Sequence, residues 1–282
     1  MLVFAQEEPA SLFGNYHPWS RDDDSDKTEL EAFTLVSDAN LREKAATDAA
    51  TIQKLAIDTK VIVVEVTKTM TTLNGFEAPW CKVRLTNGKT GYLWGGTLAC
   101  ARLFHQDTYD PQPGDNRPGI SYLIGVASMK SKEGGIVLQM RAARDGKELS
   151  KIEFPTEGGL EFYITIKSKE SSGLKNVQET IEVYTGYDAC SFVATSNLVF
   201  LTQDKLKFII ATMNSADAGA YSSSEQVLLP DEKGGIAGHV VVVSDVLTYK
   251  EAKDDIVLDE QKYSVVIYKW NGAKLTKVKE LK

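Results

Sequence analysis

The sequence has few of the residues that build metal centres and disulfide frameworks. Among its 282 residues are three cysteines and three histidines, and they are widely spaced: Cys81, Cys100, Cys190, His17, His105 and His239. Three cysteines allow at most one internal disulfide, and these spacings fit neither a zinc ribbon nor a thioredoxin-like motif. We therefore expect no metal site and no cofactor. The sequence leaves open whether Cys81 pairs with Cys100.

Long apolar runs and an excess of basic charge are also missing. The longest apolar stretches, such as residues 61–64 and 240–243, have the length of a strand and fall far short of the roughly 18 residues of a membrane-spanning helix. The formal net charge is −7, which disfavours binding to nucleic acid because that binding needs a basic surface. We expect neither a membrane span nor a nucleic-acid partner.

Proline is scarce as well, with eight residues in the chain, while 43% of the residues are hydrophobic. This composition is typical of folded globular proteins, and the length favours two domains.

The first residues of the chain resemble the end of a signal peptide followed by an N-terminal arm without regular structure. Residues 1–6 (MLVFAQ) look like the end of a secretory signal with a cleavage site near Ala5, although an ordinary apolar N-terminus is the alternative. The acidic run at residues 22–26 lacks the glycine and glutamate of an EF-hand loop, because Lys27 and Phe33 stand at those positions. We expect residues 1–31 to be a signal remnant and an N-terminal arm, on a protein secreted to the periplasm or the cell surface.

Beyond this arm the chain consists of short strand-like runs between turn residues, without a long helical stripe, which predicts an all-β fold. The runs are residues 60–66, 80–85, 136–140, 161–166, 198–201, 207–210, 239–243 and 263–268. The clearest hairpin signal is Asn87-Gly88, where we expect a type I′ turn with positive φ at both residues.

Four segments of this region together resemble the bacterial SH3-like (SH3b) domain. They are residues 39–42 (ANLR), 59–61 (TKV), 80–83 (WCKV) and 87–95 (NGKTGYLWG). Two positions depart from the family pattern: Asp58 stands where a glycine is common, and Ala45-Ala46 replace the usual proline. These departures concern the geometry of turns. The resemblance implies a small SH3-like barrel, which we place at residues 32–104.

Aromatic residues in this segment are the candidate ligand-binding residues. Strand alternation places Trp80 on the face opposite Cys81, and it places Tyr92 and Trp94 outward on the next strand. Exposed aromatic side chains are enriched in recognition sites, so we assign Trp80, Tyr92 and Trp94 to ligand binding. The alternative is that the tryptophans pack under a loop or against a second domain.

A loop-rich linker is predicted at residues 105–119, followed by a second antiparallel β domain at residues 120–282. Two hairpins there, at residues 199–208 and 266–275, look alike. They resemble the C-terminal domains that follow SH3b modules in some secreted proteins of the Bacteroides group, a resemblance that brings no activity with it.

One pair of segments points to catalysis instead. Residues 188–193 (DACSFV), with His239 49 residues after Cys190, are similar to the active-site segments of NlpC/P60 cysteine peptidases. That similarity would make Cys190 the nucleophile and His239 the base. However, Ala189 is inserted before the cysteine, and the residues after it favour a strand rather than the helix that would lower the pKa of the thiol. We therefore expect that Cys190 is not a nucleophile and that the protein is not an enzyme.

The resulting hypothesis is a secreted, non-catalytic envelope protein whose SH3b module binds a peptide or a cell-wall component. Peptidoglycan or a protein would be its partner, and this ligand rests on the resemblance alone. The alternatives are an NlpC/P60-like peptidase that acts on cell-wall peptides through Cys190 and His239, and a structural assembly component without a small ligand.

Overall fold

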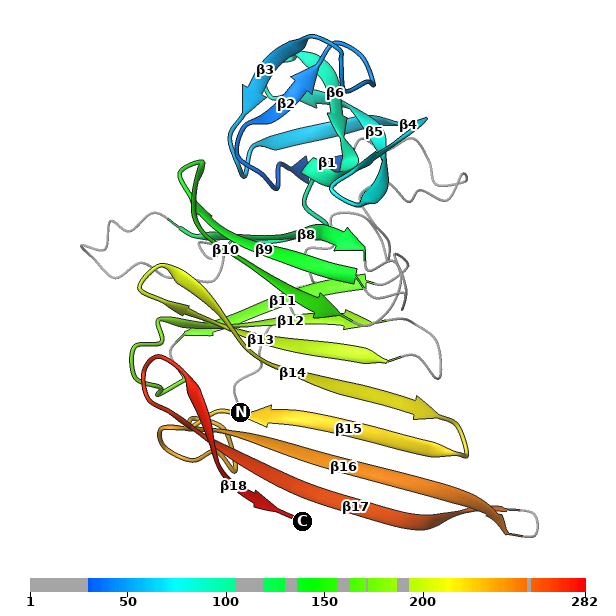
Figure 1. The fold of residues 1–282 in the computed structure, drawn as a ribbon, viewed down its shortest axis with the longest axis vertical. Helices are drawn as coiled ribbons and strands as arrows, with labels where there is room; N and C mark the ends of the chain where they lie inside the picture. Colours follow the sequence, from blue (N-terminus) through cyan, green and yellow to red (C-terminus); the bar gives the residue numbers. More distant parts are fainter. Residues whose placement is uncertain are drawn as a thin grey trace, which may run out of the picture. The chain divides into compact units, whose positions relative to one another are not determined.

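The fold was taken from a computed structural model that describes seven stretches of the chain. They are residues 30–104, 119–129, 136–156, 163–170, 172–186, 193–252 and 255–282. Within these stretches every regular element is a β-strand except the single 3-10 turn η1 (Gly95–Thr97), which confirms the predicted all-β fold (Figure 1). The N-terminal arm, with its signal remnant and acidic run, lies outside the described residues apart from Leu30 and Glu31.

The contacts between residues divide the chain into two compact units. The first unit holds β1 to β8, most of β9 and β10 and the start of β11, and the second holds the rest of these strands and β12 to β18. The linker predicted at residues 105–119 lies outside the described stretches apart from Gly119, so the predicted domain boundaries stay predictions.

The first unit begins with a six-stranded sheet that curls into an SH3-like half-barrel, in the order β1-β4-β5-β6-β2-β3. Its strands are β1 (Leu30–Phe33), β2 (Ala39–Arg42), β3 (Thr51–Leu55), β4 (Lys60–Leu73), β5 (Phe76–Leu85) and β6 (Thr90–Trp94). Alternate residues point inward and form one apolar core, which includes Leu41, Val63, Cys81, Val83 and Leu93.

A glycine allows this sheet to curl so tightly. Where β6 meets β2, a Cβ on Gly91 would lie 2.7 Å from Cγ of Leu41 and 2.9 Å from the carbonyl oxygen of Arg42. Any side chain at this position would push the two strands apart.

The turns of the hairpins partly differ from the expectation. The hairpin at Asn87-Gly88 is present, but only Gly88 has a positive φ, of 84°. The amide of Gly88 donates to the carbonyl of Leu85, as in a type I turn followed by a glycine bulge, so the predicted type I′ turn is wrong. Positive φ at both residues occurs instead at Asn74-Gly75, which joins β4 to β5 with φ of 53° and 80°.

The first unit continues with a four-stranded antiparallel sheet in the order β10-β9-β8-β7. Its strands are β7 (Ala101–Phe104), β8 (Ser121–Met129), β9 (Ile136–Arg144) and β10 (Lys147–Thr156). Strands β7 and β8 pair from Ala101 with Ile124 to Phe104 with Ser121, so the chain returns to itself after the predicted linker.

The second unit is built on an eight-stranded antiparallel sheet in sequence order from β11 to β18. Its strands are β11 (Tyr163–Glu170), β12 (Glu179–Gly186), β13 (Ala194–Thr202), β14 (Lys205–Asp217), β15 (Tyr221–Leu228), β16 (His239–Ala252), β17 (Asp255–Trp270) and β18 (Leu275–Leu281). An apolar cluster on this sheet includes Leu198, Phe200, Leu229, Val240 and Trp270.

Candidate functional site

The two predicted tryptophans form a pair on the outer side of the curled sheet. Trp80 of β5 and Trp94 of β6 are direct cross-strand partners. Trp80 neighbours Cys81, which points into the core, so alternation turns the tryptophan pair to the opposite face. Both are nevertheless buried, with exposed fractions of 2% and 4%.

The tip of the β4–β5 hairpin covers this pair. The indole N–H of Trp80 donates to Oγ1 of Thr71 at 2.8 Å, and that of Trp94 donates to the carbonyl oxygen of Thr71 at 3.0 Å. The ring of Phe76 lies 4.9 Å from that of Trp94, centre to centre. The tryptophans therefore pack beneath a loop, the alternative that the sequence left open. Their assignment to ligand binding stays a prediction, and their burial does not favour it.

Tyr92 is placed differently. It lies two residues before Trp94 on β6, and it is only half-buried. Its cross-strand partner on β5 is Lys82, and its partner on β2 is Arg42. Partners in register share a face of a sheet, so Tyr92 lies between two cationic side chains. Lys82 and Arg42 were not among the predicted site residues, although alternation from Trp80 would have placed Lys82 on this face.

The charge of the region fits this arrangement. Residues 37–99 contain eight lysines and arginines against six aspartates and glutamates, whereas the whole chain carries a net charge of −7. Residues 37–99 therefore carry a formal net charge of +2 within a protein that is acidic as a whole.

Comparison with known protein families bears on this part of the chain. Residues 37–99 match the bacterial SH3 domain. The match supports the resemblance on which the predicted SH3b module rests, and it covers most of the curled sheet. No curated protein and no solved structure matches the chain.

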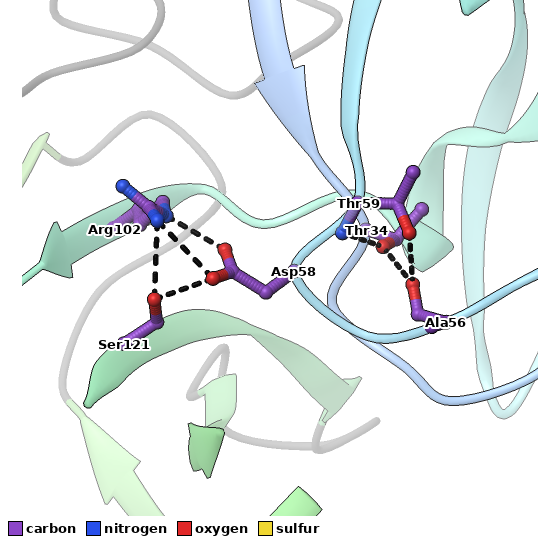
Figure 2. Close-up of polar contacts among 6 residues, drawn as sticks. All are labelled: Thr34, Ala56, Asp58, Thr59, Arg102 and Ser121. Carbon is purple, nitrogen blue, oxygen red and sulfur yellow. Dashed lines mark hydrogen bonds and ion pairs between the residues drawn. The ribbon is translucent and has the colours of Figure 1, made fainter. Parts of the chain in front are cut away.

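The bacterial SH3 domain is tied to the next sheet of its unit by a nearly buried ion pair (Figure 2). Nε of Arg102, on β7, donates to Oδ1 of Asp58 at 2.7 Å, and Nη2 donates to Oδ2 at 3.1 Å. The hydroxyl of Ser121, on β8, donates to the same carboxylate. The guanidinium also lies 4.1 Å from the ring centre of Phe33. These contacts fix the β3–β4 turn of the domain to the β7–β8 pair.

The same turn explains one departure from the family pattern. Asp58 has a φ of 62°, in the left-handed region that favours glycine. The turn is held by Thr34, whose hydroxyl donates to the carbonyl of Ala56 at 2.6 Å and accepts the amide of Thr59 at 2.8 Å (Figure 2). Aspartate therefore occupies a glycine-like position, where its carboxylate reaches Arg102.

The two described cysteines are not joined by a disulfide. Cys81 is buried in the core of the bacterial SH3 domain, and this burial raises the pKa of its thiol to about 12. Such a thiol stays protonated at neutral pH and is a poor nucleophile.

The catalytic alternative is described only in part. Cys190 lies outside the described residues, whereas Ala194–Thr202 form strand β13 rather than a helix. His239 begins β16, and its Nδ1 lies 2.8 Å from the carbonyl oxygen of Ala237. That Cys190 is not a nucleophile stays a prediction.

Two further findings concern metal ions and membranes in the described stretches. Among them, no group of three or more histidine, cysteine, aspartate or glutamate residues is placed to hold a metal ion. No helix in these stretches has the length and apolar character needed to cross a membrane.

Proposed function

We propose that the protein is a non-catalytic, extracytoplasmic binding protein whose bacterial SH3 domain captures a cell-wall component or a peptide. Bacterial SH3 domains are usually cell-wall-binding modules and are typically found outside the cytoplasm. The observation that carries the proposal is the half-buried Tyr92 between Lys82 and Arg42. A secreted location, in the periplasm or at the cell surface, is part of this proposal.

The chemistry of this face selects an acidic ligand group beside an apolar or planar one. One N–H group of the Arg42 guanidinium donates to the carbonyl oxygen of Ala49 at 2.6 Å, and its other N–H groups can donate to a ligand. Lys82 supplies a second cation on the far side of the Tyr92 ring. A carboxylate would accept hydrogen bonds from these cations, while the ring offers an amphipathic contact. Free carboxylates of cell-wall peptides and acidic peptide side chains have this character.

The test is a titration of the full chain with purified peptidoglycan and its soluble fragments. We expect Tyr92→Ala to weaken capture by about 2 kcal/mol, as loss of an aromatic hot spot does. Lys82→Ala should weaken capture too, more strongly at low than at high salt. Lys68→Ala removes the same charge from an exposed position on β4 and serves as the matched control.

Thermal melts separate a lost contact from a lost fold. If Tyr92→Ala and Lys82→Ala keep wild-type melting temperatures and wild-type capture, the face around Tyr92 is not the binding site. Equal loss of capture in Lys82→Ala and Lys68→Ala would reduce the effect of Lys82 to net charge.

A further inference from the structure

The largest difference between the sequence predictions and the structure lies in the second unit, which contains a pocket that no motif indicated. The pocket has a volume of about 470 Å³ and lies over one face of β11 to β15, with the segment after β15 at one end. Its lining consists of Lys167, Ser168, Thr180, Glu182, Tyr184, Ser196, Leu198, Thr212, Asn214, Glu225, Gln226, Val227, Leu229 and Glu232. Small-molecule sites commonly have volumes of about 300 to 1,000 Å³.

The register of the sheet brings the lining side chains together. Tyr184 of β12 pairs with Ser196 of β13, which in turn pairs with Thr212 of β14. In the next row Glu182 pairs with Leu198. Each row points to one face of the sheet, so hydroxyl groups from three strands line the same surface.

The lining of the pocket mixes apolar and polar side chains. Leu198 and Leu229 belong to the buried apolar cluster of this unit, and Val227 packs against it. Ser196 and Thr212 add hydroxyl groups to the same lining. A ligand that fits must therefore present one apolar face and several hydrogen-bonding groups.

Glu225 is a member of the lining that the sheet holds in place. Its backbone amide donates to Oδ1 of Asn214 at 2.9 Å, and its Oε2 accepts the amide of Met213 at 2.9 Å. Its Oε1 accepts the hydroxyl of Ser244 at 3.2 Å. The carboxylate is thus oriented before any ligand arrives, with further acceptor capacity on both oxygens.

Two further carboxylates are oriented in the same manner. Oε1 of Glu182 accepts the hydroxyl of Ser196, and Oε2 of Glu232 accepts the amide of Leu229 at 2.7 Å. Lys167 is the single basic residue among the lining residues, against these three glutamates. The lining therefore has an excess of two negative charges, which repels acidic ligands and attracts a protonated amine.

Tyr184 gives the pocket an aromatic wall. A Cβ on Gly186 would lie 2.9 Å from Cε1 of Tyr184, so the ring lies directly against the backbone at this glycine. An amphipathic ring held in place in this way suits the apolar face of a sugar.

We propose that this pocket binds an amino sugar: a saccharide whose hydroxyls meet the hydroxyl and amide groups of the lining and whose protonated amine meets the carboxylate of Glu225. The site is independent of the bacterial SH3 domain. It gives the protein a second, separate ligand with the opposite preference for charge.

The test is calorimetric titration of the full chain with the trimer of glucosamine, beside the trimer of N-acetylglucosamine and that of galacturonic acid. The first two trimers share a backbone and differ in charge, because acetylation removes the protonated amine. We expect the glucosamine trimer to bind at least about tenfold more tightly than the acetylated one, and the acidic trimer not to bind, because charge-assisted hydrogen bonds are the stronger kind.

Variants assign the binding to the pocket. Glu225→Gln keeps an oxygen acceptor for the amide of Met213, and we expect it to weaken binding of the glucosamine trimer about tenfold. Gly186→Ala should weaken binding of both neutral and cationic trimers by displacing the Tyr184 ring. Glu251→Gln, an exposed position on β16 outside the lining, is the matched control and should bind as the wild type does.

Absence of binding at millimolar glucosamine trimer would overturn the proposal, as would equal affinity for the glucosamine and N-acetylglucosamine trimers. Wild-type affinity in Glu225→Gln, with the fold intact by circular dichroism, would place the ligand elsewhere. Capture of peptidoglycan by the bacterial SH3 domain is measured separately, with the Tyr92 and Lys82 variants. The amino-sugar proposal and the proposed function of the SH3 domain can therefore fail independently of each other.

Discussion

The curled sheet of the bacterial SH3 domain and the eight-stranded sheet of the second unit are both antiparallel, yet they bury side chains to different extents. In the curled sheet even the outward tryptophans are covered, with exposed fractions of 2% for Trp80 and 4% for Trp94. In the eight-stranded sheet large apolar side chains on β17 stay exposed, with 52% for Leu258 and 55% for Tyr263.

Curvature and strand length account for the difference. Most strands of the curled sheet are short, and Gly91 lets β2 approach β6 closely, so the inward faces close on one core. The extended end of β4 and the start of β5 then cover the outer tryptophans. The 14 residues of β16 and the 16 of β17 instead run far beyond the apolar cluster of their sheet. In the curled sheet, the outward tryptophans are buried because the β4–β5 hairpin bends back over the sheet from which it extends.

The sharpest way to break this comparison is to remove one large buried ring from each unit. Trp270 has an exposed fraction of 4%, and its indole donates to the carbonyl of Lys175 at 2.7 Å. We expect Trp80→Ala and Trp270→Ala each to cost about 3 to 5 kcal/mol, as large-to-small substitutions of buried aromatic residues do. Hydrogen exchange read by mass spectrometry should speed up within residues 37–99 for Trp80→Ala and within β12 to β17 for Trp270→Ala. The same pattern of exchange in both variants would show that the two units do not unfold separately.

A smaller effect is expected from ion pairs of different burial. The side chains of Arg102 and Asp58 are 19% and 16% exposed, whereas those of Lys250 and Asp259, on β16 and β17, are 61% and 46% exposed. Asp58→Asn leaves the Arg102 charge poorly paired and should cost about 2 kcal/mol in denaturant unfolding. Asp259→Asn should cost less than about 0.5 kcal/mol, because solvent screens the exposed pair. Equal losses would mean that the Asp58 pair contributes no more than a surface contact.

The smallest of these effects depends on pH. Burial raises the pKa of Cys81 from 9.0 to about 12, so the folded domain keeps a proton that the unfolded chain loses above pH 9. The free energy of unfolding is therefore undiminished below pH 9 and falls as the pH rises from 9 towards 12, by up to about 1.4 kcal/mol per unit. Relative to Cys81→Ala, we expect the wild type to lose about 1 kcal/mol between pH 8.5 and pH 10 in denaturant titrations. A constant difference between the two proteins across this range would contradict the burial of the thiol.

The sequence predicted most strands that carry apolar runs, although it missed β8 (Ser121–Met129), and it missed strands such as β15 that carry none. The hairpin of β5 and β6 was found because alternation and a turn signal coincide there. Strand β15, Tyr221–Leu228, carries three serines, a glutamate and a glutamine, so no periodicity marks it. It is a strand because β16 pairs with it along its whole length. Pairing of this kind depends on partners distant in sequence, which a local pattern does not contain.

The candidate site was predictable to the same extent. Alternation placed Trp80 and Trp94 on the correct face, but the threonine-rich start of the covering tip, residues 67–72, has no apolar pattern that would show where it folds. Asp58 was recognised as a departure from the family, while its partner Arg102 lies 44 residues away. The lining of the pocket in the second unit is mostly serine, threonine, asparagine and glutamate, residue types that are equally common on open surfaces.

The final strand of the structure bears on whether molecules associate with one another at high concentration. Strand β18, Leu275–Leu281, lies at the edge of the eight-stranded sheet, where its outer backbone groups face no further strand of that sheet. It carries Lys277 and Lys279, both exposed. Lys277 and Lys279 outnumber Glu280 on this strand, so two molecules that meet along these edges bring net positive charges together, which opposes edge-to-edge pairing of their sheets. The charge on the β18 edge therefore helps to keep separate molecules from pairing through their sheets.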